Sequence, residues 1–334
     1  MARLARVIFL LVGVGLLAIL FRQVDLAAVR ADMREMGWAL PLIFLPYITV
    51  YLCDTLGWRW AFGPTVRVPF GTLFLTRMAG EAINNLTPFA YLGGEPVKAH
   101  LLSRFRIPMV EGMAASIIAK LLISIAQFIF VSLGSILAVS HLATRPDILW
   151  TLVGVVIVAG GFLAGVSRGL QRGLFTQLFR WLDRWQLTPS IWERWRTHLR
   201  RLDETIAGFY HRHPRHLVLS LLFHILGWLL GGLEVYAIFY AVGRSIDFTE
   251  AIAIEALASV AKGLAFFIPG SLGVQEGGNV LILALFGFSA SLGLTFSLLR
   301  RLRELVWISL GLLVLLRHYG WRSPRGSSSG RTAA

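Results

Sequence analysis

Long apolar stretches alternate with short basic segments along the whole chain, a pattern typical of a membrane protein with several spans. The pattern predicts an all-α fold, because a helix satisfies its own backbone hydrogen bonds inside a bilayer. We predict six membrane-spanning helices, at 7–21, 38–62, 109–140, 148–166, 217–242 and 289–316. The last one keeps its length only by continuing through the charged run SLLRRLREL, since a span needs ~20 residues.

The first interruption of this pattern lies at 80–104, GEAINNLTPFAYLGGEPVKAHLLSR. Pro88 and Pro96 each remove a backbone donor, and the Gly-Gly pair between them loosens the backbone further. Non-helical backbone at membrane depth is tolerated only where protein covers it or a watery cavity meets it. We therefore predict a re-entrant, broken-helix hairpin within 67–104 that enters and leaves on the cytoplasmic side. Its tip carries four polar residues: Glu81, Asn84, Asn85 and Glu95.

A similar interruption returns late in the chain. Pro88 lies seven residues before Glu95, and Pro269 lies seven residues before Glu276. When the two glutamates are superposed, two further pairs of ionisable residues coincide: Glu81 with Lys262, and Lys120 with Arg301. Paired broken segments in the two halves of a membrane protein are typical of an inverted repeat with a site between the copies. We therefore predict a second re-entrant hairpin, opening from the outside.

The predicted organisation is a single transmembrane domain, 1–320, followed by a disordered tail, 321–334. The two copies of the repeat span about 67–140 and 249–316, and a basic segment at 168–215 lies between them. Basic residues favour the cytoplasmic side, which places both termini and the basic segment there. Lys98, Arg104 and Arg106, just after the first hairpin, fit the same bias and are not assigned to a site.

The basic segment has ten Arg and four acidic residues. Its apolar residues recur at i, i+3 and i+4 steps, which predicts two amphipathic helices. One apolar face is formed by Phe175, Leu178, Phe179, Leu182 and Trp185, and the other by Trp192, Trp195, Leu199, Leu202, Ile206 and Phe209. Basic amphipathic helices lie on anionic leaflets, so we expect both faces to contact the inner leaflet.

Composition narrows the class of function. The chain is 56% apolar and 15% charged, too apolar for a soluble domain. Its net charge of +14 comes from basic residues between apolar segments, which indicates membrane topology and anionic lipid partners, not nucleic acid. Cys53 is the only cysteine, and the sequence contains no HExxH, GxSxG or Walker-type phosphate loop. We therefore expect no enzyme activity, no cofactor and no metal, and a homo-oligomer is left open.

Ionisable and polar residues inside the predicted spans are the candidate site, because buried charges in a membrane are costly and mark function. They are Glu81, Asn84, Asn85, Glu95, Lys120, Glu234, Lys262, Glu276, Arg300, Arg301, Arg303 and Glu304. Two interpretations are open. The charges either form an ion-pair cluster that joins helices, or they line a hydrophilic cavity for a lipid headgroup, whose phosphate suits Arg.

Three polar residues near these spans have simpler interpretations. Asp54 and Arg59 are expected to form a paired or snorkelling set, and His224 is expected to be a hydrogen-bonded packing residue. For Asn84 and Asn85 two roles are equally open: recognition of headgroup hydroxyls, or capping of the broken helix.

The runs GEAINNLTPFAYLGGEPVKAHLL, FIPGSLGVQEGG and SLLRRLREL resemble the transmembrane region of lysylphosphatidylglycerol synthases and their stand-alone flippase-like relatives. The Asn-Asn-Leu-x-Pro and Gly-Gly-Glu motifs most resemble the hopanoid-biosynthesis-associated branch. The resemblance implies a bacterial inner-membrane protein that moves a lipid. It implies a path lined by Glu81, Asn84, Asn85, Pro88, Glu95, Pro269, Gly273, Glu276, Arg300, Arg301 and Glu304.

The sequence departs from the family pattern in two respects. It lacks the soluble aminoacyl-transferase domain of the full synthases, so lysyl transfer is not expected. Many relatives carry Pro-Gly-Arg before the first glutamate, where this chain has PFAYLGGE. The expected function is a lipid flippase-like transporter of phospholipid or hopanoid, without its own ATPase. The alternatives are a membrane enzyme of lipid or isoprenoid metabolism and a scaffold for lipid synthesis.

Overall fold

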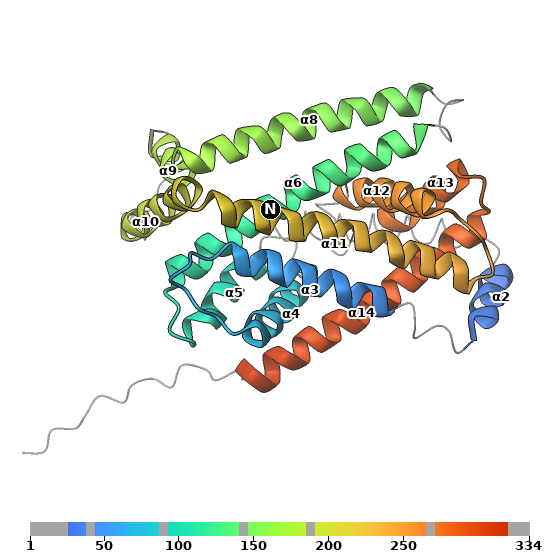
Figure 1. Ribbon diagram of the computed structural model, residues 1–334, viewed down its shortest axis with the longest axis horizontal. Coiled ribbons are helices and arrows are strands. Elements are labelled where there is room, and N and C mark those ends of the chain that lie inside the picture. Colours follow the sequence, from blue (N-terminus) through green and yellow to red (C-terminus); the bar gives the residue numbers. More distant parts are fainter. Residues whose placement is uncertain are drawn as a thin grey trace, which may run out of the picture.

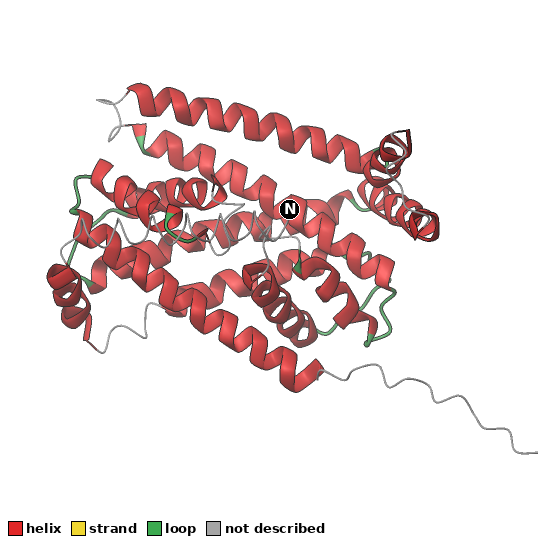
Figure 2. Cartoon of the chain, turned by 180° about the vertical axis from the view of Figure 1, so that it is seen from behind, coloured by secondary structure: helices red, strands yellow, loops and turns green. Residues whose placement is uncertain are grey.

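The computed structural model describes residues 26–37, 44–86, 93–139, 146–184, 191–264 and 271–319. Every regular element in these ranges is a helix, which confirms the all-α prediction (Figure 1, Figure 2). The predicted first span at 7–21, the tail at 321–334, Pro88 and Pro269 lie outside the described residues, whereas Pro96 lies in the first turn of α5 (Gly94–Ser103).

The described residues form twelve helices. They are α2 (Leu26–Met36), α3 (Leu45–Trp60), α4 (Phe70–Leu86), α5 (Gly94–Ser103), α6 (Met109–Leu137), α8 (Pro146–Gln171), α9 (Leu174–Arg184), α10 (Ile191–Arg212), α11 (Pro214–Ala241), α12 (Phe248–Leu264), α13 (Val274–Leu285) and α14 (Ala290–Tyr319).

Helix length separates the spans from the shorter segments. Among the described residues, α6, α8 and α11 are long and apolar enough to cross a membrane. The helix α14 has 30 residues, and its charged run lies within one unbroken helix, as predicted. The helices α4, α5, α12 and α13 have 17, 10, 17 and 12 residues, fewer than the ~20 that a span needs. The chain is therefore a multi-pass membrane protein that also contains two pairs of short helices.

The two predicted copies have matching helices. Glu95 and Glu276 are 181 positions apart, and the starts of α6 and α14, Met109 and Ala290, are also 181 apart. In each copy two short helices precede one long helix, with α4 and α5 before α6 and α12 and α13 before α14. The spacing of the motifs is thus also the spacing of the helices.

Two glycines make equivalent contacts in the two copies. A Cβ atom on Gly112 would lie 3.2 Å from the Cα of Ala99, and one on Gly293 would lie 2.7 Å from the Cα of Val280. Both members of each pair are again 181 positions apart. In each copy the start of the long helix therefore packs directly on the backbone of the preceding short helix.

The copies also interlock. The long helix α6 packs against α12 of the other copy, and α14 packs against α4 (Figure 1). Glycines make both crossings close, because Gly134 faces Ala256 and Gly311 faces the backbone carbonyl of Met78. The α4–α5 pair and the α12–α13 pair lie towards opposite ends of the molecule (Figure 1).

The amphipathic helices differ in part from the sequence prediction. Leu202, Ile206 and Phe209 of α10 are buried in the core that α10 shares with α3 and α6. Their expected contact with the leaflet is therefore wrong for this part of α10, because α6 offers an equally apolar surface. On α9, Leu178 stays 52% exposed, whereas Phe179 is buried.

We expect Gly293→Ala to lower the melting temperature of the detergent-purified protein. The new methyl group would overlap the backbone of α13, and overpacking typically costs about 1–3 kcal/mol. Gly161→Ala is the control, because a Cβ there meets nothing within 4 Å and Ala favours a helix by about 1 kcal/mol. Equal melting temperatures for the two variants would contradict this close packing.

A second prediction concerns the direction of the two copies. Ser103 ends α5 and Ser289 precedes α14, and both are exposed. In a Cys53→Ser background, we expect Ser103→Cys and Ser289→Cys to react with an impermeant maleimide from opposite sides of the membrane. Labelling from the same side would contradict an inverted repeat.

Candidate functional site

The first short-helix pair holds a buried charge cluster. The Lys98 ammonium lies 2.7 Å from Glu81 and 3.2 Å from Glu95, and Lys120 on α6 lies 3.9 Å from Glu95. Glu95 is in the first turn of α5, where the positive end of the helix dipole stabilises a carboxylate. Sequence reasoning left Lys98 out of the site, although its position three residues after Glu95 places both on one helix face.

The two asparagines have different roles. The Asn84 Oδ1 accepts a hydrogen bond of 2.6 Å from the backbone N–H of Gly94, and Asn84 is 1% exposed. It caps α5, which favours the capping interpretation over headgroup recognition. Asn85 donates to the backbone carbonyl of Glu81 at 2.8 Å and also lines a cavity.

The second pair of short helices, α12 and α13, repeats this arrangement, but different residues cap the start of its second helix. Glu276 accepts a 2.7 Å hydrogen bond from the N–H of Gly273, which is the N-cap of α13. Gly273 has φ +76°, a conformation that L side chains rarely adopt. The other oxygen of Glu276 accepts from Arg301 at 2.6 Å, so Glu276–Arg301 corresponds to Glu95–Lys120 in the first copy.

The remaining bases of the charged run point to different helices. Arg300 forms an ion pair of 2.7 Å with Glu255 on α12, and Arg303 pairs with Glu234 on α11. Glu304 bridges Arg301 at 2.7 Å and Lys262 at 2.6 Å. All seven predicted ionisable residues of the second half are therefore in one connected network, because Arg303 also reaches Glu304 at 3.9 Å and Arg300 reaches Glu234 at 3.9 Å. They are Glu234, Lys262, Glu276, Arg300, Arg301, Arg303 and Glu304.

Sequence reasoning missed Glu255 and Arg77. Glu255 lies seven residues before Lys262 in an otherwise apolar helix, and Arg77 lies four before Glu81. Glu255 therefore lies on the same helix face as Lys262, and Arg77 on the same face as Glu81. This shared face is the sequence signal by which the two residues could have been found.

The expected pairing of Asp54 with Arg59 is wrong. Asp54 pairs with Arg77 at 2.7 Å and with the Nδ1 of His224 at 2.9 Å. Arg59 is exposed, because it lies five residues further along α3 and so on another face. His224 is 1% exposed and hydrogen-bonded, in keeping with the packing role expected for it.

A polar cavity of about 90 Å³ lies between the two copies. Glu81, Asn85 and Arg77 line it from the first copy, and Lys262 and Glu304 line it from the second. Its other walls include the aromatic residues Tyr47, Tyr51 and Trp307. Glu81 and Lys262, the pair of opposite charge that the repeat superposes, thus line one cavity. A volume of this size holds several waters but no lipid headgroup, since a water needs about 10–15 Å³.

We expect Arg303→Met to destabilise the protein by about 3–5 kcal/mol, because it leaves the Glu234 carboxylate buried without its main partner. The double variant Arg303→Met/Glu234→Gln should regain much of this loss. Arg200→Met is the control, since the exposed Arg200–Glu204 pair contributes at most about 1 kcal/mol. Thermal unfolding of the wild type, Arg303→Met, Glu234→Gln and the double variant gives the coupling, and additive effects would contradict a direct pair.

Comparisons with known proteins agree with this architecture. The family described as "Lysylphosphatidylglycerol synthase TM region" matches residues 6–312. A UPF0104 membrane protein of Methanothermobacter thermautotrophicus is 25% identical, covering 94% of this chain and 95% of its own. A UPF0104 membrane protein of Pyrococcus horikoshii is 26% identical, covering 92% of this chain and 96% of its own. The chain therefore belongs to the lysylphosphatidylglycerol synthase transmembrane-region family.

Proposed function

We propose that this protein is a lipid transporter that moves the headgroup of a phospholipid or hopanoid-type amphiphile across the membrane, between the two copies of its repeat. The observation that carries the proposal is the shared cavity, into which each copy contributes charged side chains. Membrane transporters built from repeats bind their substrates at such an interface. The family description, which names a lipid synthase region, supports a lipid as the substrate class.

The site offers a headgroup both basic and acidic side chains. Lys262 and Glu304 keep 31% and 10% of their side chains exposed, and Glu81 keeps 16%. Bases suit a lipid phosphate and carboxylates suit a hydroxyl or ammonium group. Tyr47, Tyr51 and Trp307 add flat apolar surface beside these charges. A mixed lining of this kind fits a polar headgroup better than an acyl chain.

Some buried donors in the network lack a protein acceptor. Among the described residues, the Arg301 Nη2, Arg300 Nε and Arg303 Nε atoms are buried and donate to no protein acceptor. An ion-pair cluster that served packing alone would be expected to satisfy such groups, because an unsatisfied buried donor is costly. These donors lie next to the cavity residue Glu304 along α14 but do not line the cavity itself, so they would meet a headgroup only after the cavity enlarges.

Transport requires the cavity to enlarge, since about 90 Å³ cannot hold a headgroup. The ion pairs that close it, such as Lys262–Glu304, would exchange with contacts to the lipid. Titration of the glutamates and downhill supply of lipid are both open as the source of energy. The proposed setting is a bacterial inner membrane with both termini in the cytoplasm.

The test is lipid translocation in proteoliposomes with headgroup-labelled phospholipids and a native lipid extract. We expect the wild type to accelerate crossing, and Lys262→Met, Arg301→Ala and Glu95→Gln each to reduce the rate at least about tenfold, as loss of a charge-assisted contact does. Arg244→Gln, an exposed residue beyond α11, is the control and should keep the wild-type rate.

Crossing no faster than in empty liposomes, for every lipid of the extract, would overturn the transporter. Chemical change of the extract without crossing would identify a membrane enzyme instead. If neither occurred and the site variants kept cellular function, the scaffold alternative would hold.

A further inference from the structure

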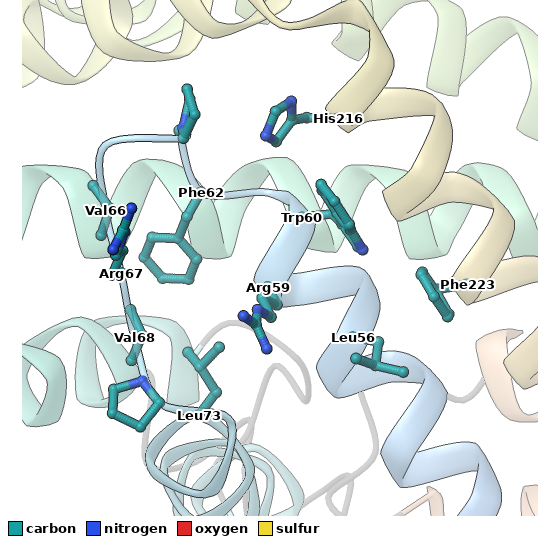
Figure 3. A pocket seen from close by; sticks show the side chains of 13 residues that line it. Leu56, Arg59, Trp60, Phe62, Val66, Arg67, Val68, Leu73, His216 and Phe223 are labelled. Carbon is teal, nitrogen blue, oxygen red and sulfur yellow. The ribbon is translucent and has the colours of Figure 1, made fainter.

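A second, larger pocket lies apart from the charge network, at the end of the molecule that carries α9 and α10 (Figure 1, Figure 3). Its volume is about 910 Å³, and it is formed by the end of α3, the loop at 61–69, the first turn of α4 and the first three turns of α11. Neither the transport proposal nor the family description assigns it a role. Its size suits a whole lipid headgroup with its glycerol unit, as drug-sized sites have about 300–1,000 Å³.

Basic side chains dominate the polar part of this pocket. Arg59, Arg67 and His216 line it, and none of the lining residues that the structure describes is acidic (Figure 3). Within the described part of the chain, neither arginine forms an ion pair, and both are exposed. This contrasts with the buried arginines Arg77, Arg300, Arg301 and Arg303, each of which pairs with a carboxylate. Two guanidinium groups without an acidic partner among the described residues therefore provide a site for an anion.

The rest of the pocket is aromatic and apolar. Trp60 and Phe223 stand on facing helices, and the Trp60 ring contacts the His216 ring edge-on at a centroid distance of 5.2 Å. Tryptophan beside basic residues is typical of the level of lipid headgroups in a membrane. A free phosphate would use only the basic part, whereas a lipid would use both parts.

The apolar surface continues from the pocket along the two helices. Leu52 lies one turn before Leu56 on α3 and is 37% exposed, and Leu226 lies three residues after Phe223 on α11 and is 43% exposed. Residues at these spacings share a helix face. A bound lipid could thus place its phosphate between the arginines and its acyl chains along α3 and α11.

From this charge complementarity we infer that the pocket binds the phosphodiester headgroup of an anionic phospholipid, with Arg59 and Arg67 as the phosphate ligands. The site is separate from the cavity at Lys262 and does not depend on transport through it. It would hold an anionic lipid even in a protein whose central site is inactive.

The test is equilibrium binding to the full-length protein in neutral maltoside micelles, measured by thermophoresis. The probes are dioctanoyl phosphatidylglycerol, dioctanoyl phosphatidylcholine, and glycerophosphoglycerol, which has the same headgroup without chains. We expect phosphatidylglycerol to bind best, and Arg59→Gln/Arg67→Gln to weaken it at least about tenfold. Arg172→Gln/Arg180→Gln removes the same charge from exposed positions at the same end and should leave binding unchanged.

A third variant separates loss of charge from loss of structure. Arg59→Lys/Arg67→Lys keeps both charges, so it should bind within about threefold of the wild type, because Lys still attracts phosphate as a point charge. Equal weakening by the glutamine and control pairs would overturn the site, as would equal binding of phosphatidylcholine. Binding of glycerophosphoglycerol as tight as that of the lipid would also overturn it, since the ligand would then be a soluble phosphodiester.

Discussion

The cost of placing charge in an apolar environment is the constraint on which this structure depends. One unpaired ion at the centre of a bilayer costs a few kcal/mol or more, and this protein carries several inside its helices. Each acid of the central network therefore faces a base on another helix or another turn. The helices cannot slide or rotate freely, because every such movement would separate a buried pair. The ion pairs thus hold α4 and α6 against α5, and α11, α12 and α13 against α14.

Broken helices allow this pairing. A short helix that begins inside the protein presents backbone N–H groups and the positive end of its dipole at that depth. Glu95 and Glu276 lie in the first turns of α5 and α13, so each carboxylate is stabilised both by its helix and by a base. A continuous span would place such a glutamate mid-helix and leave only the base to stabilise it. The breaks are therefore part of the electrostatics as well as of the chain path.

The two predicted copies carry opposite charges at one equivalent position. Glu81 and Lys262 occupy equivalent positions and line one cavity with opposite charges. Two glutamates there would repel each other, whereas an acid and a base keep the cavity close to neutral when it is empty. In the proposed transporter, the same pair would offer a lipid headgroup one contact of each sign.

The sequence by itself determined the helical class, the long charged helix α14, the repeat spacing and most of the charged residues of the site. These follow from neighbours along the chain, because periodicity, prolines and glycines act over one or two turns. Only the tertiary structure decided which charges pair. Arg77 meets Asp54 across 23 positions and Arg303 meets Glu234 across 69, distances at which helix crossings, not local pattern, bring side chains together. For the same reason the apolar face of α10 was predicted correctly, while its partner, α6, was not.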